Sequence, residues 1–418
     1  MKTNNDTSHR LCKSMESQIT YPQAEYDRAR VVLMHEPEEE LSLGTFHSDA
    51  ALFKCYLDPD AAKAEHRGYQ QLLQRLGVRV FTIRDILLKD CVDAQYQWIE
   101  GPATEVLRRL ASQAISFVTD NHLDAAEVEE YRQSLLKLYT PNDLLRILIQ
   151  RPEIRLKKSA INTGVEAEYH LKPLMNLFYM RDQMVTTAKG IVIGRMNSSQ
   201  RKYECDLVAF CLHKLGIEPL GRIEGEDAFL EGGDYLPMRD FAFINCGLRT
   251  TAAAIEQLMT NDWLGKDRLV VVQDRWKSQK QMHLDTFFNV VDQDLATLCS
   301  NRYEAKPGEE QYLTVSIYQR GADRGYQLES DGQGFVDFLQ SQGVEVLPIQ
   351  PADEEHFANN FLCIEGREIV MVAGQSEELK QQLQERGVTV HWAPLTNLTH
   401  GYGAAHCMTQ IIGRSLRK

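Results

Sequence analysis

The sequence predicts an α/β fold made of repeated short strand–helix–strand units arranged with pseudo-symmetry, interrupted by one helical insertion. The first observation is a run of β-branched and apolar residues at 29–34, followed by a helical pattern and a second strand. The second is that this pattern recurs along the chain. The third is that residues 92–165 show helical spacing with no expected strand.

The first unit shows the pattern most clearly. A strand is expected at 29–34, and the acidic, proline-containing stretch 35–40 should end it. A helix begins near Asp60, because apolar residues recur on one face until Gly77 stops it. A second strand is expected at 78–83. The residues of the apolar helix face are Ala64, Tyr69, Leu72, Leu73 and Leu76.

Later units follow the same scheme, starting with a hairpin around the Lys189-Gly190 turn. Its strands are expected at 184–187 and 191–193, and further strands at 241–245, 269–273, 361–372 and 388–390. Helices are expected at 199–214, 250–260, 331–342 and 376–386.

The chain therefore divides into three parts. Residues 1–20 are expected to form a flexible tail, and 21–91 together with 166–418 an α/β catalytic domain. Residues 92–165 are expected to form the helical insertion, in which a Thr140-Pro141 pair marks a helix start.

Composition excludes several classes of function. The 46 basic and 59 acidic side chains give a net charge of −13, which argues against nucleic acid or an anionic membrane as partner. No apolar run is long enough to span a bilayer, and the first ten residues lack the apolar core of a signal peptide. Nine cysteines without a C-x-x-C pair fit reduced thiols and a cytoplasmic location.

Cys407 is the candidate nucleophile. It lies in the glycine- and alanine-rich run 401–409 (GYGAAHCMT), where a substrate could approach the backbone closely. Acidic segments upstream suggest a cationic substrate, and a guanidinium group needs carboxylates that accept paired hydrogen bonds. Asp182 and Asp285 are candidates for that clamp, although Asp182 could equally be a turn or cap residue.

His283 is the candidate acid and base. If 282–286 were a strand, His283 and Asp285 would share one face and lie over the same substrate. The same pair could be half of a metal site, but no second cluster of suitable spacing accompanies it, so no metal is expected. Glu231, followed by two glycines, could orient His283 or simply lie in a solvated turn.

Together, these segments resemble the arginine deiminases of the guanidino-group-modifying superfamily. The resemblance rests on several motifs in the family's order: 31–37 (VVLMHEP), 176–182 (NLFYMRD), 231–234 (EGGD), 244–250 (INCGLRT), 282–286 (MHLDT) and 406–409 (HCMT). It implies a five-bladed α/β propeller with a helical insertion after the first repeat. It also implies hydrolysis of L-arginine to citrulline and ammonia, without a cofactor.

The resemblance further implies a role for each site residue. Cys407 would attack the guanidinium carbon, His283 would protonate ammonia and then activate water, and Glu231 would support His283. Asp182 and Asp285 would hold the guanidinium. Asn176, Arg201 and Arg249 would bind the rest of the substrate, and the two arginines would hold its α-carboxylate.

Three places depart from the family pattern, and the first is residues 52–55 (LFKC), which replace a more acidic segment. Tyr402 stands where deiminases usually have an arginine that helps to hold or gate the substrate, and Gln183 replaces a proline. Tyrosine cannot form a bidentate salt bridge, so agmatine or a peptidyl arginine is an alternative to free arginine as substrate. An amidinotransferase or a non-catalytic guanidino-binding protein would also fit these residues. Homo-oligomerisation is compatible with the sequence but not specified by it.

Overall fold

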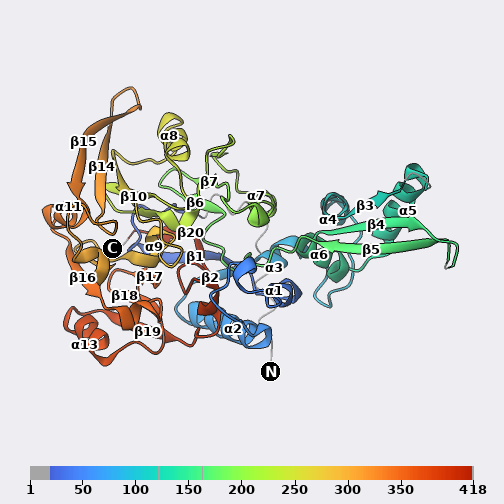
Figure 1. Cartoon of the computed structure of the whole chain (residues 1–418), viewed down its shortest axis with the longest axis horizontal. Helices are drawn as coiled ribbons and strands as arrows, with labels where there is room; N and C mark the ends of the chain where they lie inside the picture. Colours follow the sequence, from blue (N-terminus) through green and yellow to red (C-terminus); the bar gives the residue numbers. More distant parts are fainter. Residues whose placement is uncertain (1–18, 121–122, 162, 417–418) are drawn as a thin grey trace.

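The structure is a computed structural model that describes residues 19–120, 123–161 and 163–416. The tail predicted at 1–20 lies outside these residues except for 19 and 20. Helices and strands form a broad α/β body, from which an elongated arm extends to one side (Figure 1). The mixed α/β class predicted from the sequence is confirmed, with most strands in small sheets.

Each sheet of the body has the same local pairing in the described residues. A central strand pairs antiparallel on one side and parallel on the other. The central strands are β1 (Arg28–Met34), β7 (Ile191–Ile193), β10 (Phe241–Cys246), β13 (Leu295–Cys299) and β18 (Glu368–Val372). Most of their residues are buried, as expected for strands covered on both faces.

The flanking strands complete these sheets. The antiparallel neighbours are β20 (Gln410–Ser415), β6 (Met184–Thr186), β9 (Tyr235–Pro237), β12 (Phe288–Asp292) and β17 (Leu362–Glu365). The parallel neighbours are β2 (Arg79–Thr82), β8 (Gly221–Arg222), β11 (Arg268–Gln273), β16 (Glu345–Ile349) and β19 (Thr389–Ala393). Beyond β11, the sheet continues with β14 (Thr314–Arg320) and β15 (Tyr326–Gly334).

Helices connect the strands of the body. Those predicted from about residue 60 and at 199–214, 250–260, 331–342 and 376–386 are present, whereas the other helices of the body were not predicted. The longer ones are α2 (Pro59–Arg75), α3 (Ile83–Leu88), α7 (Glu204–Lys214), α8 (Ala252–Thr260), α11 (Phe335–Ser341) and α13 (Glu377–Glu385). The short ones are α1 (Glu39–Gly44), α9 (Leu284–Phe287), α10 (Ser300–Tyr303), α12 (Pro351–Glu354), and the 3-10 turns η2 (Asp49–Ala51), η3 (Ser199–Arg201), η4 (Gly232–Asp234) and η5 (Leu398–Gly401). Across the described residues, no helix has both the length and the apolar character to cross a membrane.

The first and last strands of the body pair with each other. β20 runs antiparallel to β1, so the segment that carries Cys407 is anchored beside the first unit of the chain. Buried Arg414 of β20 strengthens this junction, because its guanidinium donates to the carbonyl oxygens of Asp27 and Cys363 at 2.7 and 2.8 Å. Charge-assisted bonds of this kind are stronger than neutral ones.

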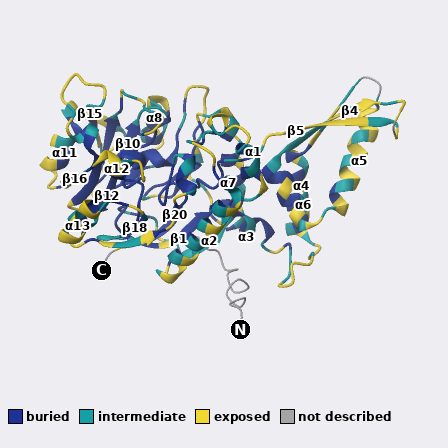
Figure 2. Cartoon of the chain, turned by 60° about the horizontal axis from the view of Figure 1, so that its bottom comes forward, coloured by how far each residue is buried: buried dark blue, intermediate teal, exposed yellow. Residues whose placement is uncertain are grey.

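The arm corrects the prediction of a purely helical insertion at 92–165. The expected helices are present, but strands lie between and after them: α4 (Pro102–Ala114), β3 (Ser116–Thr119), α5 (Ala125–Leu138), α6 (Pro141–Gln150), β4 (Pro152–Lys158) and β5 (Val165–Leu171). The order of this sheet is β3-β4-β5, so it continues past residue 165. Its strands are only partly buried, and β5 is largely exposed (Figure 2). They therefore lack the long apolar run that marks a core strand.

A close backbone approach at Gly232 positions the acidic turn of η4. A Cβ atom at this residue would collide with the carbonyl oxygens of Arg181 and Met184. We therefore expect Gly232→Ala to destabilise the fold by about 2 kcal/mol, as measured by urea unfolding. Gly68→Ala, inside α2, is the control. A Cβ there meets no atom within 4 Å, so the free energy of unfolding should rise by roughly 0.5–1 kcal/mol. Equal effects of both changes would contradict this explanation.

Candidate functional site

The five predicted catalytic residues come together from four segments of the body. Asp182 precedes β6, Glu231 precedes η4, His283 and Asp285 lie at α9, and Cys407 precedes β20. All five side chains are more than nine-tenths buried. A thiol, an imidazole and three carboxylates therefore share one small, water-poor region, where electrostatic interactions are stronger than at the surface.

Cys407 faces Asp285 at the centre of this region. Its Sγ atom lies 3.7 Å from Oδ2 and 3.9 Å from Oδ1 of Asp285. Gly403 passes directly beside the thiol: a Cβ atom on this glycine would lie 2.9 Å from Cys407 Cβ and 3.1 Å from Sγ. The glycine expected to allow a close approach thus makes room for the nucleophile itself.

The Cys407 thiol is held in its neutral form by its surroundings. Burial raises its pKa well above the usual value, and the nearby carboxylates of Asp285 and Asp182 raise it further. A thiol must lose its proton to become a strong nucleophile. A positive charge is therefore needed next to the sulfur for reaction at neutral pH.

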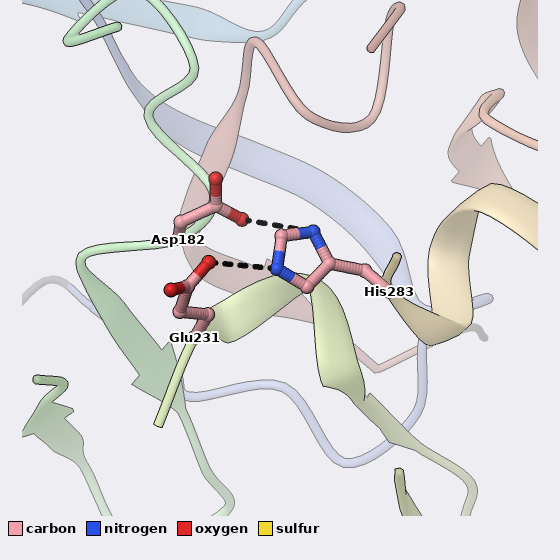
Figure 3. A group of neighbouring side chains, drawn as sticks. All are labelled: Asp182, Glu231 and His283. Atoms are coloured by element: carbon pink, nitrogen blue, oxygen red, sulfur yellow. Dashed lines mark hydrogen bonds and ion pairs between the residues drawn. The ribbon is translucent and has the colours of Figure 1, made fainter. Parts of the chain in front are cut away.

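His283 lies between two carboxylates (Figure 3). Its Nε2 atom is 2.8 Å from Oε2 of Glu231, and its Nδ1 atom is 3.6 Å from Oδ1 of Asp182. The expectation that His283 and Asp285 share one face of a strand is wrong. His283 precedes the short helix α9, where its backbone N–H donates to Thr286 Oγ1 at 3.3 Å. The helical turn directs Asp285 toward Cys407 instead.

The carboxylates around His283 keep it protonated. Burial alone would lower its pKa, but Asp182, the hydrogen bond to Glu231, and Asp234 together raise it to about 10. Burial would likewise raise the pKa of Glu231, yet the bond from His283 and the charge of Arg249 lower it to about 2. At neutral pH, His283 is thus an imidazolium paired with Glu231, ready to donate a proton.

Asp285 has a second histidine behind it. The Nδ1 atom of His406 lies 2.6 Å from Oδ2 of Asp285, and its Nε2 atom lies 3.4 Å from Oε1 of Glu25. Glu25 is bonded in turn to Arg414 of β20. The sequence included His406 in a motif but assigned it no role. The structure shows it fixing the carboxylate that faces the nucleophile.

Arg201 is fully occupied by buried acceptors. Its Nη1 atom lies 2.7 Å from Oδ2 of Asp182, and its Nη2 atom lies 2.8 Å from Oε2 of Glu204. Gln183, which departs from the family pattern, also donates to Glu204 at 2.7 Å. Of the two carboxylate oxygens of Asp182, Oδ2 therefore accepts from Arg201, and Oδ1 has no hydrogen-bond partner in the described part of the chain.

Arg249 is much less occupied. Its closest carboxylate oxygen, Oε1 of Glu231, is 3.9 Å from Nη1, and Nη2 reaches Oε1 of Gln279 only at 3.5 Å. Its buried Nε atom has no hydrogen-bond partner among the described residues. A buried guanidinium with open donors is suited to bind an anion.

The remaining two predicted substrate-binding residues lie on loops of the body. Asn176 is buried and donates from Nδ2 to the carbonyl oxygen of Ala51 at 3.0 Å. Tyr402 is half-buried and has a φ of +67°, a left-handed backbone conformation that residues other than glycine seldom adopt. It ends η5 immediately before the segment that carries Cys407.

Asn360 is the residue of this site that the sequence did not reveal. It is fully buried, and its Nδ2 atom lies 3.1 Å from Cys407 Sγ. It stands before β17, far from Cys407 along the chain, in no recognisable motif. No local signal identifies it, because its role depends on a tertiary contact.

Asp182, Glu231 and His283 could also form a metal site by distance alone. In the described part of the chain, they form a group whose ligand atoms lie within 4.8 Å of one another. In this structure the three side chains contact one another directly, because His283 lies 2.8 Å from Glu231 and 3.6 Å from Asp182 and so forms an ion-pair network with both.

Comparison with known proteins identifies a family. A family model described as arginine deiminase matches residues 49–414. The arginine deiminase of Staphylococcus epidermidis is 24% identical over 414 residues, which cover 94% of this chain and 97% of the relative. That of Halobacterium salinarum is 24% identical over 333 residues, which cover 60% of this chain and 66% of the relative.

Solved structures share the fold at low sequence identity. The N-terminal domain of ArgZ, a cyanobacterial arginine dihydrolase, has a TM-score of 0.53 and 12% identity, covering 92% of this chain and 98% of that one. A DDAH from Pseudomonas aeruginosa has a TM-score of 0.52 and 14% identity, with coverage of 91% and 98%.

The buried imidazolium makes folding stability depend on pH. His283 has a pKa of about 10 in the fold and about 6.5 when unfolded. The stabilisation of the fold by the charged His283 is therefore complete below about pH 6.5 and is lost as the pH rises toward 10. His283→Gln lacks this contribution. The difference between the unfolding free energies of native protein and variant should narrow from pH 6 to pH 9.5 in urea titrations. Exposed His47→Gln is the control, and a narrowing of equal size there would contradict the explanation.

Proposed function

Because the chain belongs to the arginine deiminase family, we propose that it hydrolyses L-arginine to citrulline and ammonia with Cys407 as the nucleophile. The observation that carries this proposal is a buried thiol that faces the carboxylate of Asp285, in the same region as a buried imidazolium that contacts Asp182. This arrangement provides a nucleophile, a proton donor and a receptor for a cation in one site.

The guanidinium of the substrate supplies the missing positive charge. Oδ1 of Asp182 has no hydrogen-bond partner among the described residues, and Asp285 faces the thiol, so both can accept N–H groups from a substrate lying against Cys407. The same carboxylates raise the pKa of Cys407 in the empty site. A bound guanidinium reverses that local field and favours the thiolate, so substrate binding itself ionises the nucleophile and the thiol proton is released to solvent.

The reaction then proceeds in two balanced steps. The sulfur electron pair forms a C–S bond to the guanidinium carbon, and a C–N bond breaks, with its electron pair leaving on ammonia. His283 supplies the proton for this departure. In the second step water gives a proton to His283 and its oxygen bonds to the same carbon. The C–S bond breaks and the sulfur recovers its electron pair. The protonated ureido group then gives its hydroxyl proton to the sulfur, which regenerates the thiol and releases citrulline.

Arg249 is the better candidate for the substrate's α-carboxylate. Arg201 shares the role implied by the family resemblance, but its donors are already used by Glu204 and Asp182. It is better placed to hold Asp182 in position. Tyr402, which stands where the family usually has an arginine, can offer one hydroxyl group to a substrate.

The finer description of the fold is a five-bladed propeller of pseudo-symmetric α/β units with an inserted arm. The identical pairing around β1, β7, β10, β13 and β18 supports it. So does the pairing of β20 with β1, since it joins the end of the chain to its first unit. In this proposal the active-site residues come from the loops between the units.

The direct test offers the protein L-arginine, agmatine and a blocked peptidyl arginine, without an added amine, and measures ureido product and ammonia. L-Arginine should give both products in equal amounts, and Cys407→Ala should give neither. Turnover only when an acceptor amine is added would favour an amidinotransferase instead. Binding of arginine without a covalent adduct on Cys407 would favour a non-catalytic protein.

The carboxylate-binding role of Arg249 can be separated from a general loss of activity. Agmatine has the guanidinium of arginine but no carboxylate. Arg249→Met should lower kcat/KM for arginine by about 10- to 100-fold, the value of a hydrogen-bonded ion pair, and change agmatine turnover much less. Arg201→Met is the matched control and should impair both substrates, because it releases Asp182. Equal losses on both substrates in Arg249→Met would refute this assignment.

A further inference from the structure

The side chain of Asn360 joins the nucleophile to both of its neighbouring segments. Its Nδ2 atom donates to Cys407 Sγ at 3.1 Å and to the carbonyl oxygen of Asp285 at 3.0 Å. Its Oδ1 atom accepts from the backbone N–H groups of Ala404 at 2.8 Å and Cys407 at 3.1 Å. The amide is fully buried and lies just before β17.

These contacts fix which end of the amide faces the sulfur. The two backbone N–H groups can only donate, so the atom that meets them must be the amide oxygen. The nitrogen is then forced toward Cys407 and the carbonyl of Asp285. Asn360 therefore holds a hydrogen-bond donor on the nucleophilic atom.

The Asn360 donor opposes the other electrostatic effects on the sulfur. Burial, Asp285 and Asp182 all oppose a negative charge on the sulfur, whereas the Asn360 donor favours it. Asn360 is neutral, so it can favour the thiolate without repelling a cationic substrate. A lysine or arginine in its place would compete with the guanidinium for the carboxylates.

We propose that Asn360 is a catalytic residue whose Nδ2–H group stabilises the Cys407 thiolate. This inference rests on the function proposed above. The donor acts twice in that reaction: before the sulfur pair forms the C–S bond, and when this bond breaks and returns the pair to sulfur. Between these events the sulfur is an uncharged thioether-like atom and a weak acceptor. The bond is therefore strongest when charge develops on the sulfur, which is the requirement for catalysis.

The neighbouring residue provides a natural control. Asn359 is also buried, and its Nδ2 atom lies at the same distance, 3.1 Å, from the sulfur of buried Cys299. Cys299 ends β13 and takes no part in the site. The chain thus contains two adjacent asparagines with the same contact to a thiol, one in the site and one in the core.

The test measures alkylation of Cys407 by iodoacetamide without substrate, from pH 6 to 10, with mass spectrometry of the peptide that carries Cys407. Asn360→Asp keeps the acceptor for the two N–H groups and removes the donor. Its alkylation rate at pH 8 should fall by about 10- to 100-fold, and its profile should shift to higher pH. The kcat for arginine should fall by a similar factor.

Three comparisons make the test decisive. Asn360→Ala removes the donor without adding a charge. If Cys407 is also alkylated more slowly in this variant, the slower alkylation results from the lost donor rather than from an added carboxylate. Asn359→Asp should leave Cys407 alkylation unchanged, and circular dichroism melting shows that the variants are folded. An unchanged rate in folded Asn360→Asp, or an equal loss in Asn359→Asp, would overturn the assignment. If the native protein turned over no guanidino compound but the alkylation shift persisted, the proposed function would fail while the thiolate contact would stand.

Discussion

The site depends on the burial of several carboxylates around one thiol. Asp182, Glu231, Asp234 and Asp285 are all nearly inaccessible to water. Such charges are strongly destabilising in a protein interior unless they are paired or hydrogen-bonded. The imidazolium of His283 and the guanidinium of Arg201 provide part of that pairing. Burial raises the pKa of Asp234 to about 6, because an ionised carboxylate is costly away from water.

The same constraint favours a cationic substrate. Both carboxylates beside the nucleophile are backed by a histidine that also contacts a second buried acid. His283 lies between Asp182 and Glu231, and His406 lies between Asp285 and Glu25. This common arrangement fixes the direction of each carboxylate. A guanidinium that enters the site pairs with these carboxylates. It also lowers the pKa of the Cys407 thiol, which is the group that will attack it.

Glycines and strand pairing make this dense arrangement possible. Gly232 lets the acidic turn approach the backbone around Arg181 and Met184, and Gly403 leaves space for Cys407. The pairing of β20 with β1 holds the nucleophile's segment from its C-terminal side. Asn360 ties the same segment to Asp285 from the other side. The nucleophile is thus positioned by contacts from several units of the body, whereas the arm extends away from it (Figure 1).

The sequence by itself determined the α/β class, the positions of several helices and strands of the body, and the candidate nucleophile Cys407. These follow from local periodicity, glycine stops and short motifs, which act over a few residues. Only the tertiary structure decided that the arm contains a sheet, that His283 and Asp285 point to different partners, and that Arg201 is held by Glu204. It also revealed Asn360 and the contacts of His406. These features depend on hydrogen bonds and ion pairs between residues far apart along the chain, which local sequence patterns do not encode.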